Sequence, residues 1–568
     1  MKKIYLPLLV FLFLPLFLLS SQEKVDPICR GIQKEIKRSM DSLRLENSVA
    51  PCFIDYMGND LLALNVEAQL GSLVNSSEVN YVNSRSSVLV GSYEQNNLNV
   101  RTSLDELFGY FDYPRGFLVT DQEEVLRTEV WKVLDEKYKA SVERYNSKQS
   151  LLRNTEVPIE ERNIPDFQRL EQRICIYPKE PLNYDIRELE EYLKEASLVF
   201  ADYPDIVDSN VRIYAGTSYV RYCNSENTVC CYPNNLVALF IYTKGRSVDG
   251  EDLVLTKSCY SSTIEELPSL DSLKALCKAQ ADYYQIRRTS ETLDESYVGP
   301  VLFEGEAVAD LVTQLLLSTE NSLVAKRKPL LDEGLKMNLR YYSQMPAQAL
   351  GNGLETFMNR KVISRDLTLT SMSGTEKYQG KRLFGYIPVD AQGVSPAKEM
   401  DLIKEGVLVN MLTSREPSKF FKESNGHMRV SPNLNYMGVY PGVLRLQSKR
   451  TMPESELKAK LLAAAKEEDY PYGYIIRKVN GDIPIEIYQV DVATGKEKLM
   501  RGGRILNLLL RSLKHVSGVS DKENVYNRIF QDVKSSYIVP SGLLLEEVEI
   551  VKDQRIEYKK PYIVDRPE

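Results

Sequence analysis

The chain has only two histidines, His427 and His515, and no cysteine beyond Cys277. A mechanism or metal site based on histidine therefore has only two candidate residues, and cysteine ligands are restricted to the N-terminal half of the chain. The sequence also contains neither a G-x-S-x-G motif nor a glycine-rich loop that ends in Lys followed by Ser or Thr. It thus lacks the sequence signatures of the α/β-hydrolases and of the P-loop nucleotide-binding proteins.

An excess of positive charge is also lacking. The formal net charge is −7, and basic and aromatic residues do not interleave in a stripe, so the sequence carries no electrostatic footprint for nucleic acid. Hydrophobic residues make up 43% and charged residues 27% of the chain, as is typical of a globular protein. With 568 residues the chain is too long for one compact core, so two or more domains are expected.

The N-terminus has the pattern of a secretory signal. Lys2 and Lys3 precede the uncharged apolar run Ile4–Leu19, and small residues follow up to Ser21. We expect cleavage between Ser21 and Gln22 and export to the periplasm or the extracellular space. An uncleaved N-terminal anchor is the alternative. No later stretch approaches the roughly 18 apolar residues of a spanning helix, so no membrane span is expected after cleavage.

All eight cysteines lie between Cys29 and Cys277. In an exported protein they can form disulfides, because the periplasm is oxidising. The tightest group is Cys223, Cys230 and Cys231, whose C-x6-C-C spacing is not that of a zinc site. Disulfides or buried free thiols are both compatible with this group, and the sequence leaves the pairing open.

Apolar residues at helical spacing predict four helices before residue 290. Between them, short apolar or alternating runs predict strands, and proline-rich residues 155–184 predict a connection. The expected domain is an N-terminal unit of the α/β type, residues 22–295, with long helices. The predicted helices are Pro27–Leu43, Asp121–Asn154, Asp185–Phe200 and Leu267–Arg288.

Strand patterns dominate from Ser364 onward, and residues 321–352 read as a mobile connection. One helix, Pro453–Glu468, interrupts the strands, and Thr451 with Glu454 fits a capping box at its start. The C-terminal unit, residues 296–568, is therefore expected to be sheet-rich and barrel-like. The fold class predicted for the whole chain is α+β.

Five blocks of sequence stand out in the C-terminal half. The first runs from a Gly-Pro-Val strand into a helix, the second carries an Asp-x-x-Gly turn and a hairpin, and the third is a polar Gly-Arg loop. The fourth is a strand with a Pro-Gly turn, and the fifth is an apolar strand near the C-terminus. The blocks are Tyr297–Leu317, Gly385–Arg415, Ser424–Arg429, Asn435–Gly442 and Ile538–Ile550. In this order the five blocks resemble the TldD/PmbA family, whose closing strand corresponds to the fifth, and the chain most resembles its long, exported members.

The resemblance implies a metallopeptidase-related protein, but the zinc ligands of metal-bearing members are missing. Their HExxxH motif falls on Val312, Thr313 and Leu317 here, and the Cys-Gly before the closing strand has no counterpart. Valine and leucine cannot bind a metal, and threonine does not replace a carboxylate base. We therefore expect no metal ligands and no zinc cofactor.

Candidate catalytic residues are Glu304, Glu306, Asp310 and His427. The three carboxylates crowd the start of the predicted helix, where the helix dipole alone can account for them. Acid–base chemistry by two of them would require their pKa values to be split. His515 follows a helix-like apolar run, where a structural role is expected.

Candidate peptide-binding residues are Asn425, His427 and Arg429, in a polar loop that could grip a carbonyl or carboxylate. The alternative is a surface turn in which Asn-Gly supplies positive φ. We expect this loop on the wall of a concave surface, near Glu304 and Glu306.

Three functional hypotheses follow. The first is a metal-free protein that binds or acts on unfolded peptides in a cavity, as a homo-oligomer or as the partner of a metal-bearing relative; the resemblance implies this pairing. The second is an active hydrolase built on Glu304, Glu306, Asp310 and His427. The third is a structural envelope protein.

Overall fold

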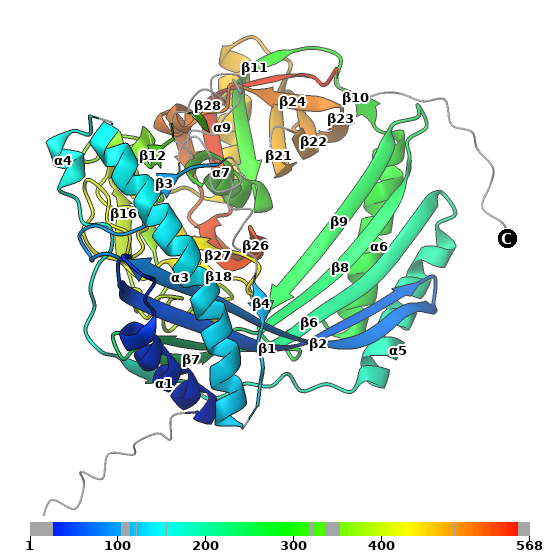
Figure 1. Ribbon diagram of the computed structural model, residues 1–568. Helices are drawn as coiled ribbons and strands as arrows, with labels where there is room; N and C mark the ends of the chain where they lie inside the picture. The colour runs from blue at the N-terminus through cyan, green and yellow to red at the C-terminus, as the bar shows by residue number, and fades with distance from the viewer. Residues whose placement is uncertain are drawn as a thin grey trace, which may run out of the picture.

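The computed structural model describes residues 26–103, 114–120, 122–154, 156–317, 322–332, 334–335, 353–480 and 483–554. A sheet with outer helices forms the N-terminal part, residues 26–289, and it faces a C-terminal part, residues 291–554, built on two further sheets (Figure 1). The predicted α+β class is confirmed. No helix within the described ranges is long and apolar enough to cross a membrane.

The N-terminal sheet is built on three strands of 19 residues each, β1 (Pro51–Gln69), β2 (Ser72–Val90) and β6 (Ile206–Asn224). β1 pairs antiparallel with both others. The far edge of β6 pairs with two strands, one along each half of its length. The remaining strands of this sheet are β4 (Arg115–Gly116), β5 (Ile174–Ile176), β7 (Val229–Pro233), β8 (Leu236–Arg246) and β9 (Asp252–Ser261).

Four helices cover the outer face of this sheet, two at each end. α1 (Pro27–Ser42) and α3 (Glu123–Asn154) pack over the first end, and α5 (Ile186–Ser197) and α6 (Leu270–Thr289) over the second. All four predicted helices are confirmed. The long helix buries the predicted stripe, namely Leu126, Val130, Leu134, Tyr138 and Val142.

Alternation along β1 separates its two faces. Ile54, Tyr56, Leu64 and Val66 pack under the helices. The intervening odd-numbered residues face the C-terminal part, and Asn59 donates to the carbonyl of Pro432 there. Because side chains alternate across a strand, one strand serves the helix layer and the opposite part at once.

The two C-terminal sheets curve into a half-barrel around one large apolar core, which confirms the expected sheet-rich, barrel-like unit. The first sheet contains β10 (Glu291–Thr292), β11 (Tyr297–Glu304), β21 (Tyr472–Asn480), β22 (Ile483–Asp491), β23 (Glu497–Arg501), β24 (Gly503–Leu506), β25 (Val516–Val519) and β28 (Gly542–Lys552). The second contains β13 (Leu367–Ser371), β16 (Met400–Lys404), β17 (Val407–Leu408), β20 (Val443–Ser448), β26 (Glu523–Phe530) and β27 (Val533–Pro540). The hairpin predicted near residue 405 is β16–β17.

Two helices accompany these sheets, α7 (Glu306–Leu316) and α9 (Glu454–Glu467). The capping box predicted for the second helix is wrong. Pro453 occupies the N-cap position without a side-chain cap, so Thr451 lies outside the helix. The short elements are α4 (Ile159–Arg162), η1 (Leu198–Asp202), η3 (Gly353–Phe357), η4 (Leu510–Lys514), β3 (Val100–Arg101), β12 (Leu330–Leu331), β14 (Lys377–Tyr378), β15 (Lys381–Arg382), β18 (Met428–Val430) and β19 (Met437–Val439). Most of the connection predicted at 321–352 lies outside the described residues.

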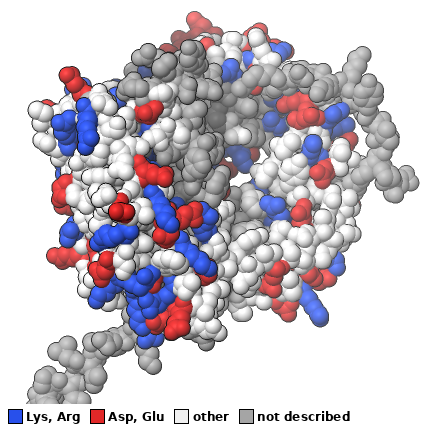
Figure 2. Space-filling view, viewed as in Figure 1, with Lys and Arg blue, Asp and Glu red and all other residues white. Residues whose placement is uncertain are grey.

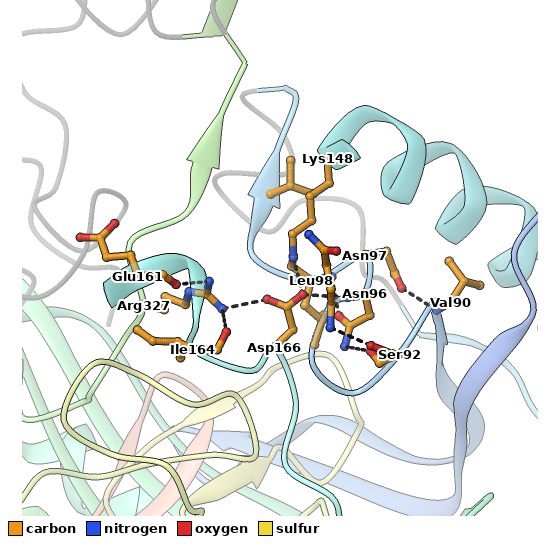
Figure 3. Close-up of polar contacts among 12 residues, drawn as sticks. Val90, Ser92, Asn96, Asn97, Leu98, Lys148, Glu161, Ile164, Asp166 and Arg327 are labelled. Atoms are coloured by element: carbon orange, nitrogen blue, oxygen red, sulfur yellow. Dashed lines mark hydrogen bonds and ion pairs between the residues drawn. The ribbon is translucent and has the colours of Figure 1, made fainter. Parts of the chain in front are cut away.

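A buried carboxylate, Asp166, joins the two parts (Figure 3). It accepts hydrogen bonds from Lys148 Nζ of α3 at 2.5 Å and from Arg327 Nη1 of the C-terminal part at 2.8 Å. The Asn96 amide, in the loop after β2, donates to it at 2.7 Å. The side chains of Lys148 and Asp166 are each 2% exposed, so both charges depend on this pairing.

We predict that Asp166→Asn lowers the free energy of unfolding by about 3–5 kcal/mol, because it leaves two buried cations without their counter-charge. The matched control is Asp135→Asn, which breaks the exposed pair with Lys139 on the same helix and should cost about 0.5 kcal/mol or less. Urea unfolding of both variants measures the difference. Equal losses in the two variants would contradict the role given to Asp166.

Candidate functional site

The predicted junction between strand and helix is formed by β11, Gly305 and α7. Gly305 has φ +61°, a conformation that favours glycine, and turns the chain so that the helix begins at once. The three candidate carboxylates flank this turn, but each has a basic partner. Glu304 pairs with Arg477 at 2.9 Å and Glu306 with Arg528 at 3.0 Å.

Asp310 is the most buried of the three carboxylates. It pairs with Arg528 and accepts the Val479 amide at 2.9 Å. Burial raises the pKa of Asp310 above its ordinary value, and the neighbouring Arg528 opposes that shift. The pairing fixes α7 to β26 and β21. As acid–base groups, these carboxylates would first have to leave their arginine partners.

The positions that would carry a metal site do not fit one. Val312 and Leu317 are buried in the core of the C-terminal part, and the hydroxyl of Thr313 donates to the Ala309 carbonyl within α7. Within the described ranges, no group of three or more His, Cys, Asp and Glu side chains is placed to hold a metal ion. This helix face therefore packs as core, and no zinc-dependent step can be assigned to it.

His427 is buried in a chain of hydrogen bonds. Its Nδ1 lies 2.8 Å from Asn425 Oδ1, and its Nε2 lies 2.8 Å from Ser371 Oγ and 3.2 Å from Ser373 Oγ. Asn425 Oδ1 also accepts the Thr413 amide. The His427 Nδ1–H is therefore the donor to Asn425, and Nε2 of the neutral imidazole is left to accept a serine hydroxyl. Ser371 is the nearer donor, and Ser373 is hydrogen-bonded to Ser371 at 3.1 Å.

Ser371, His427 and Asn425 thus align as a nucleophile, a base and an orienting group would. Two observations argue against such a function. Ser371 and His427 are each only 1% exposed. Burial, with a smaller contribution from Arg429, lowers the pKa of His427 to about 3, which makes it a weak base near neutral pH. The arrangement stabilises the turn around Gly426.

Arg429 is also buried, at 3% exposure, and donates to the carbonyls of Gly385 and Lys534. Burial lowers its pKa to about 10. The sequence predicted an open binding wall for Asn425, His427 and Arg429. The structure instead encloses His427 and Arg429 and half-buries Asn425, because strands β13 and β27 close over the loop. Their assignment to peptide binding stays a prediction.

The second and third of the five sequence blocks, residues 385–415 and 424–429, meet at Asp390. This is the first residue of the predicted Asp-x-x-Gly turn. Asp390 accepts the amides of Gln392 and Val394 and, at 3.1 Å, that of Met428. Burial raises its pKa to about 6. The turn is confirmed, and through the Met428 amide it holds the segment that carries His427.

An open groove lies on the inner face of the N-terminal sheet, opposite the helices. It has a volume of about 590 Å³. The loop at residues 432–435 closes one end, since the Asn83 side chain donates to the Asn433 carbonyl at 2.9 Å. The inner groove is lined by Leu61, Ala63, Asn65, Ser77, Val79, Tyr81, Asn83, Arg212, Tyr214, Asn433 and Asn435.

The lining of the inner groove combines aromatic, amide and apolar side chains with a single charged one. Tyr81 is 47% and Val79 42% exposed. Arg212 supplies the charge and stacks over Phe240 at 5.1 Å. Figure 2 shows a hollow between the N-terminal sheet and the C-terminal part, whereas charged side chains crowd the surface of α3.

Comparison with known families identifies the C-terminal part. Residues 296–552 match the family model described as the PmbA/TldA metallopeptidase C-terminal domain. The chain carries this domain. The implied resemblance to the TldD/PmbA family is thereby supported for the region that holds the five blocks. No curated protein matches the chain in sequence.

Solved structures are similar over nearly the whole chain. TldE from Thermococcus kodakarensis has a TM-score of 0.55 at 11% identity, over 92% of this chain and 100% of its own. A protein from Thermotoga maritima described as a modulator of a DNA gyrase has a TM-score of 0.55 at 14% identity. The match covers 88% of this chain and 96% of that protein. A protein with the same description from Bacteroides thetaiotaomicron has a TM-score of 0.53 at 10% identity. The match covers 92% of this chain and 98% of that protein. At sequence identities of 10%, 11% and 14%, this similarity shows a shared fold alone.

The residues of the inner groove could not be predicted from the sequence. The alternation along β1 and β2 indicated strands, but it did not show that polar residues such as Asn65 and Asn83 face a hollow instead of bulk solvent. Ser371 was missed because it lies 56 residues before His427 and has no local motif.

We predict that His427 makes stability depend on pH. Its pKa is lower in the folded protein, so the unfolded chain takes up a proton as the pH falls below about 6.5 while the native protein does not. Stability is lost in that window, down to about pH 3. Between pH 7 and pH 5 the free energy of unfolding of the wild type should fall by about 2 kcal/mol more than that of His427→Gln. The figure follows from about 1.4 kcal/mol per pH unit below the pKa of the unfolded histidine.

Urea unfolding at both pH values measures this difference. His515→Gln, at an exposed histidine, is the matched control and should follow the wild type. Asp390 titrates in all three proteins, so its contribution cancels. Parallel pH profiles for wild type and His427→Gln would mean that His427 takes up its proton over the same pH range in the native protein as in the unfolded chain.

Proposed function

We propose that this chain is an exported protein that binds unfolded peptides in the inner groove without a metal ion. It would act as a metal-free partner of a metal-bearing relative. The observation that carries the proposal is the contrast between two regions. The residues at the family's metal positions are apolar core, whereas the inner groove is open and lined by groups suited to a peptide.

The lining favours an extended polypeptide over a compact ligand. Asn65, Asn83 and Asn435 offer amide groups that both donate and accept, as peptide N–H and C=O groups require. Tyr81 and Tyr214 offer flat surfaces for side chains of any sequence. Such a lining recognises the main chain, which all unfolded peptides share.

The single charge indicates a polarity for the bound peptide. Among the described residues of the lining, Arg212 is the one that carries a charge, and a guanidinium pairs well with a carboxylate. We therefore place the peptide's C-terminal carboxylate, or an acidic side chain, at Arg212. This placement rests on the peptide-binding proposal.

Binding of a fluorescently labelled unfolded peptide, measured by anisotropy, tests the proposal. The double variant Val79→Ala/Tyr81→Ala should weaken binding about tenfold or more, since exposed aromatic anchors carry much of the energy in such sites. Val207→Ala, at a residue of β6 that is 72% exposed outside the groove, is the control and should bind as wild type does. A chelator should leave the affinity unchanged.

Three results would each contradict the proposal. They are an absence of binding by the wild type, equal affinity in the groove variant, and loss of binding with chelator. Arg212→Gln should reduce affinity for a peptide with a free C-terminus and leave an amidated peptide unaffected. An equal effect on both peptides would remove Arg212 from carboxylate recognition.

Export is tested by the N-terminus of protein isolated from the cell envelope. Because a basic pair and an apolar run precede Ser21, the mature chain should begin within a few residues of Gln22. N-terminal sequencing or intact mass measures this. A chain that still begins at Met1 would indicate an anchored protein instead.

A further inference from the structure

Strand β7 carries two adjacent cysteines whose side chains lie on opposite faces of the N-terminal sheet. Cys231 packs in the core under α1 and α3, together with Cys29 and Cys223. Cys230 packs in a different core, between the sheet and the C-terminal part, with Val389 and Ala391. This opposition follows from the alternation of side chains along a strand. Each cysteine of the pair has a cysteine from a distant segment beside it.

The outer pair is Cys29 and Cys231. Their sulfur atoms lie 3.3 Å apart, although 202 residues separate them in sequence. Both side chains are 0% exposed. Cys223 is a competing partner on the same face, because its thiol also interacts with the Cys29 thiol and its sulfur lies 3.7 Å from the Cys29 carbonyl.

The inner pair is Cys175 and Cys230, on the parallel strands β5 and β7. They are register partners, as are Ile174 with Val229 and Ile176 with Cys231. Neighbouring strands lie about 4.8 Å apart, and register partners share a face, so the Cα separation falls in the range that a disulfide spans. Cys175 is half-buried and therefore accessible, whereas Cys230 is fully buried.

From this placement we propose that β7 is an oxidation site that forms two disulfides, Cys29–Cys231 and Cys175–Cys230. The oxidant is a protein or small-molecule disulfide, such as a thiol oxidase of the cell envelope. The proposal is independent of peptide binding. Export would supply the oxidant in the cell, but the pairing itself follows from the fold.

Cys175 has the features of the attacking thiol. The Cys230 thiol and the Arg173 guanidinium, whose Nε lies 2.9 Å from the Cys175 sulfur, lower its pKa to about 6. The Cys175 thiolate attacks one sulfur of the oxidant and releases the other as a thiolate. Cys230 then loses its proton, attacks the Cys175 sulfur and releases the second oxidant thiolate. Two thiols are oxidised and one disulfide is reduced.

The two bonds differ in when they can form. In the folded protein an oxidant reaches Cys175, so the inner bond can form after folding. The outer pair is enclosed, so its bond forms during folding, before α1 closes over β7. The same exposure predicts the order of reduction, in which a mild reductant opens the inner bond first.

The experiment refolds the purified protein in a buffer of reduced and oxidised glutathione, blocks free thiols with an alkylating agent and digests with trypsin without reduction. Two bonds use four of the eight cysteines, so four alkylated thiols are expected. The tryptic peptides 25–30, 174–179 and 222–244 should appear joined, since the last carries Cys223, Cys230 and Cys231.

Variants assign the bonds within that joined species. Cys223→Ser should retain both links. In its background, adding Cys231→Ser should release peptide 25–30, and adding Cys230→Ser should release peptide 174–179. Cys52→Ser and Cys259→Ser, at half-buried cysteines outside the two pairs, should change neither link. Release of peptide 25–30 by Cys223→Ser alone would overturn the proposal, as would the opposite assignment.

Measurements on the wild type keep the proposal falsifiable if a variant fails to fold. Reduction should lower the midpoint of thermal unfolding by about 5 °C or more, since bonds that close long loops stabilise a protein. Addition of oxidised glutathione to protein folded under reducing conditions should oxidise Cys175 and Cys230 only. Eight free thiols after refolding, or a lasting glutathione adduct on Cys175, would overturn the proposal.

Discussion

The arrangement of the two parts depends on buried ion pairs between them, among which the cluster at Asp166 joins three segments of the chain. This one carboxylate receives Lys148 from the end of the long helix, Arg327 from the C-terminal part and the Asn96 amide from the loop after β2. Removing two cations and an anion from water is costly, and only their mutual pairing offsets that cost. The pairing tolerates little displacement of one part against the other. The inner groove has residues of both parts in its lining, so the same pairing fixes its width.

Much of the fold could be predicted from the sequence, because local signals agree with tertiary burial in the helices. The stripe from Leu126 to Val142 repeats every four residues, and the structure buries it. The α9 cap failed because Pro453 takes the capping position, which a motif match cannot show. The pairing of β6 with three strands was also beyond prediction, since register depends on partners far away in the chain.

The candidate site was predicted less well, for a physical reason. Polar residues in a glycine-containing loop are usually exposed, and His427 and Arg429 fitted that pattern. Their burial depends on Ser371, Gly385 and Lys534, which come from other segments of the chain. That Val312 and Leu317 cannot serve as metal ligands was readable from residue type, because an aliphatic side chain cannot coordinate zinc wherever it lies. Chemistry that a side chain cannot perform is easier to predict than the surroundings of one that can.

The long strands of the N-terminal sheet restrict how this protein can change in length. β1 contributes Ile54 to the core under α1 and α3, Met57 to the core shared with the C-terminal part, and Leu64 to the core under α5 and α6. One residue inserted near its middle would exchange the two faces from that point onward. Leu64 would then face the groove, and Asn65 the helices. A change in length is therefore compatible with this sheet only at the strand ends and in the connections, where it leaves the two faces of β1 in place.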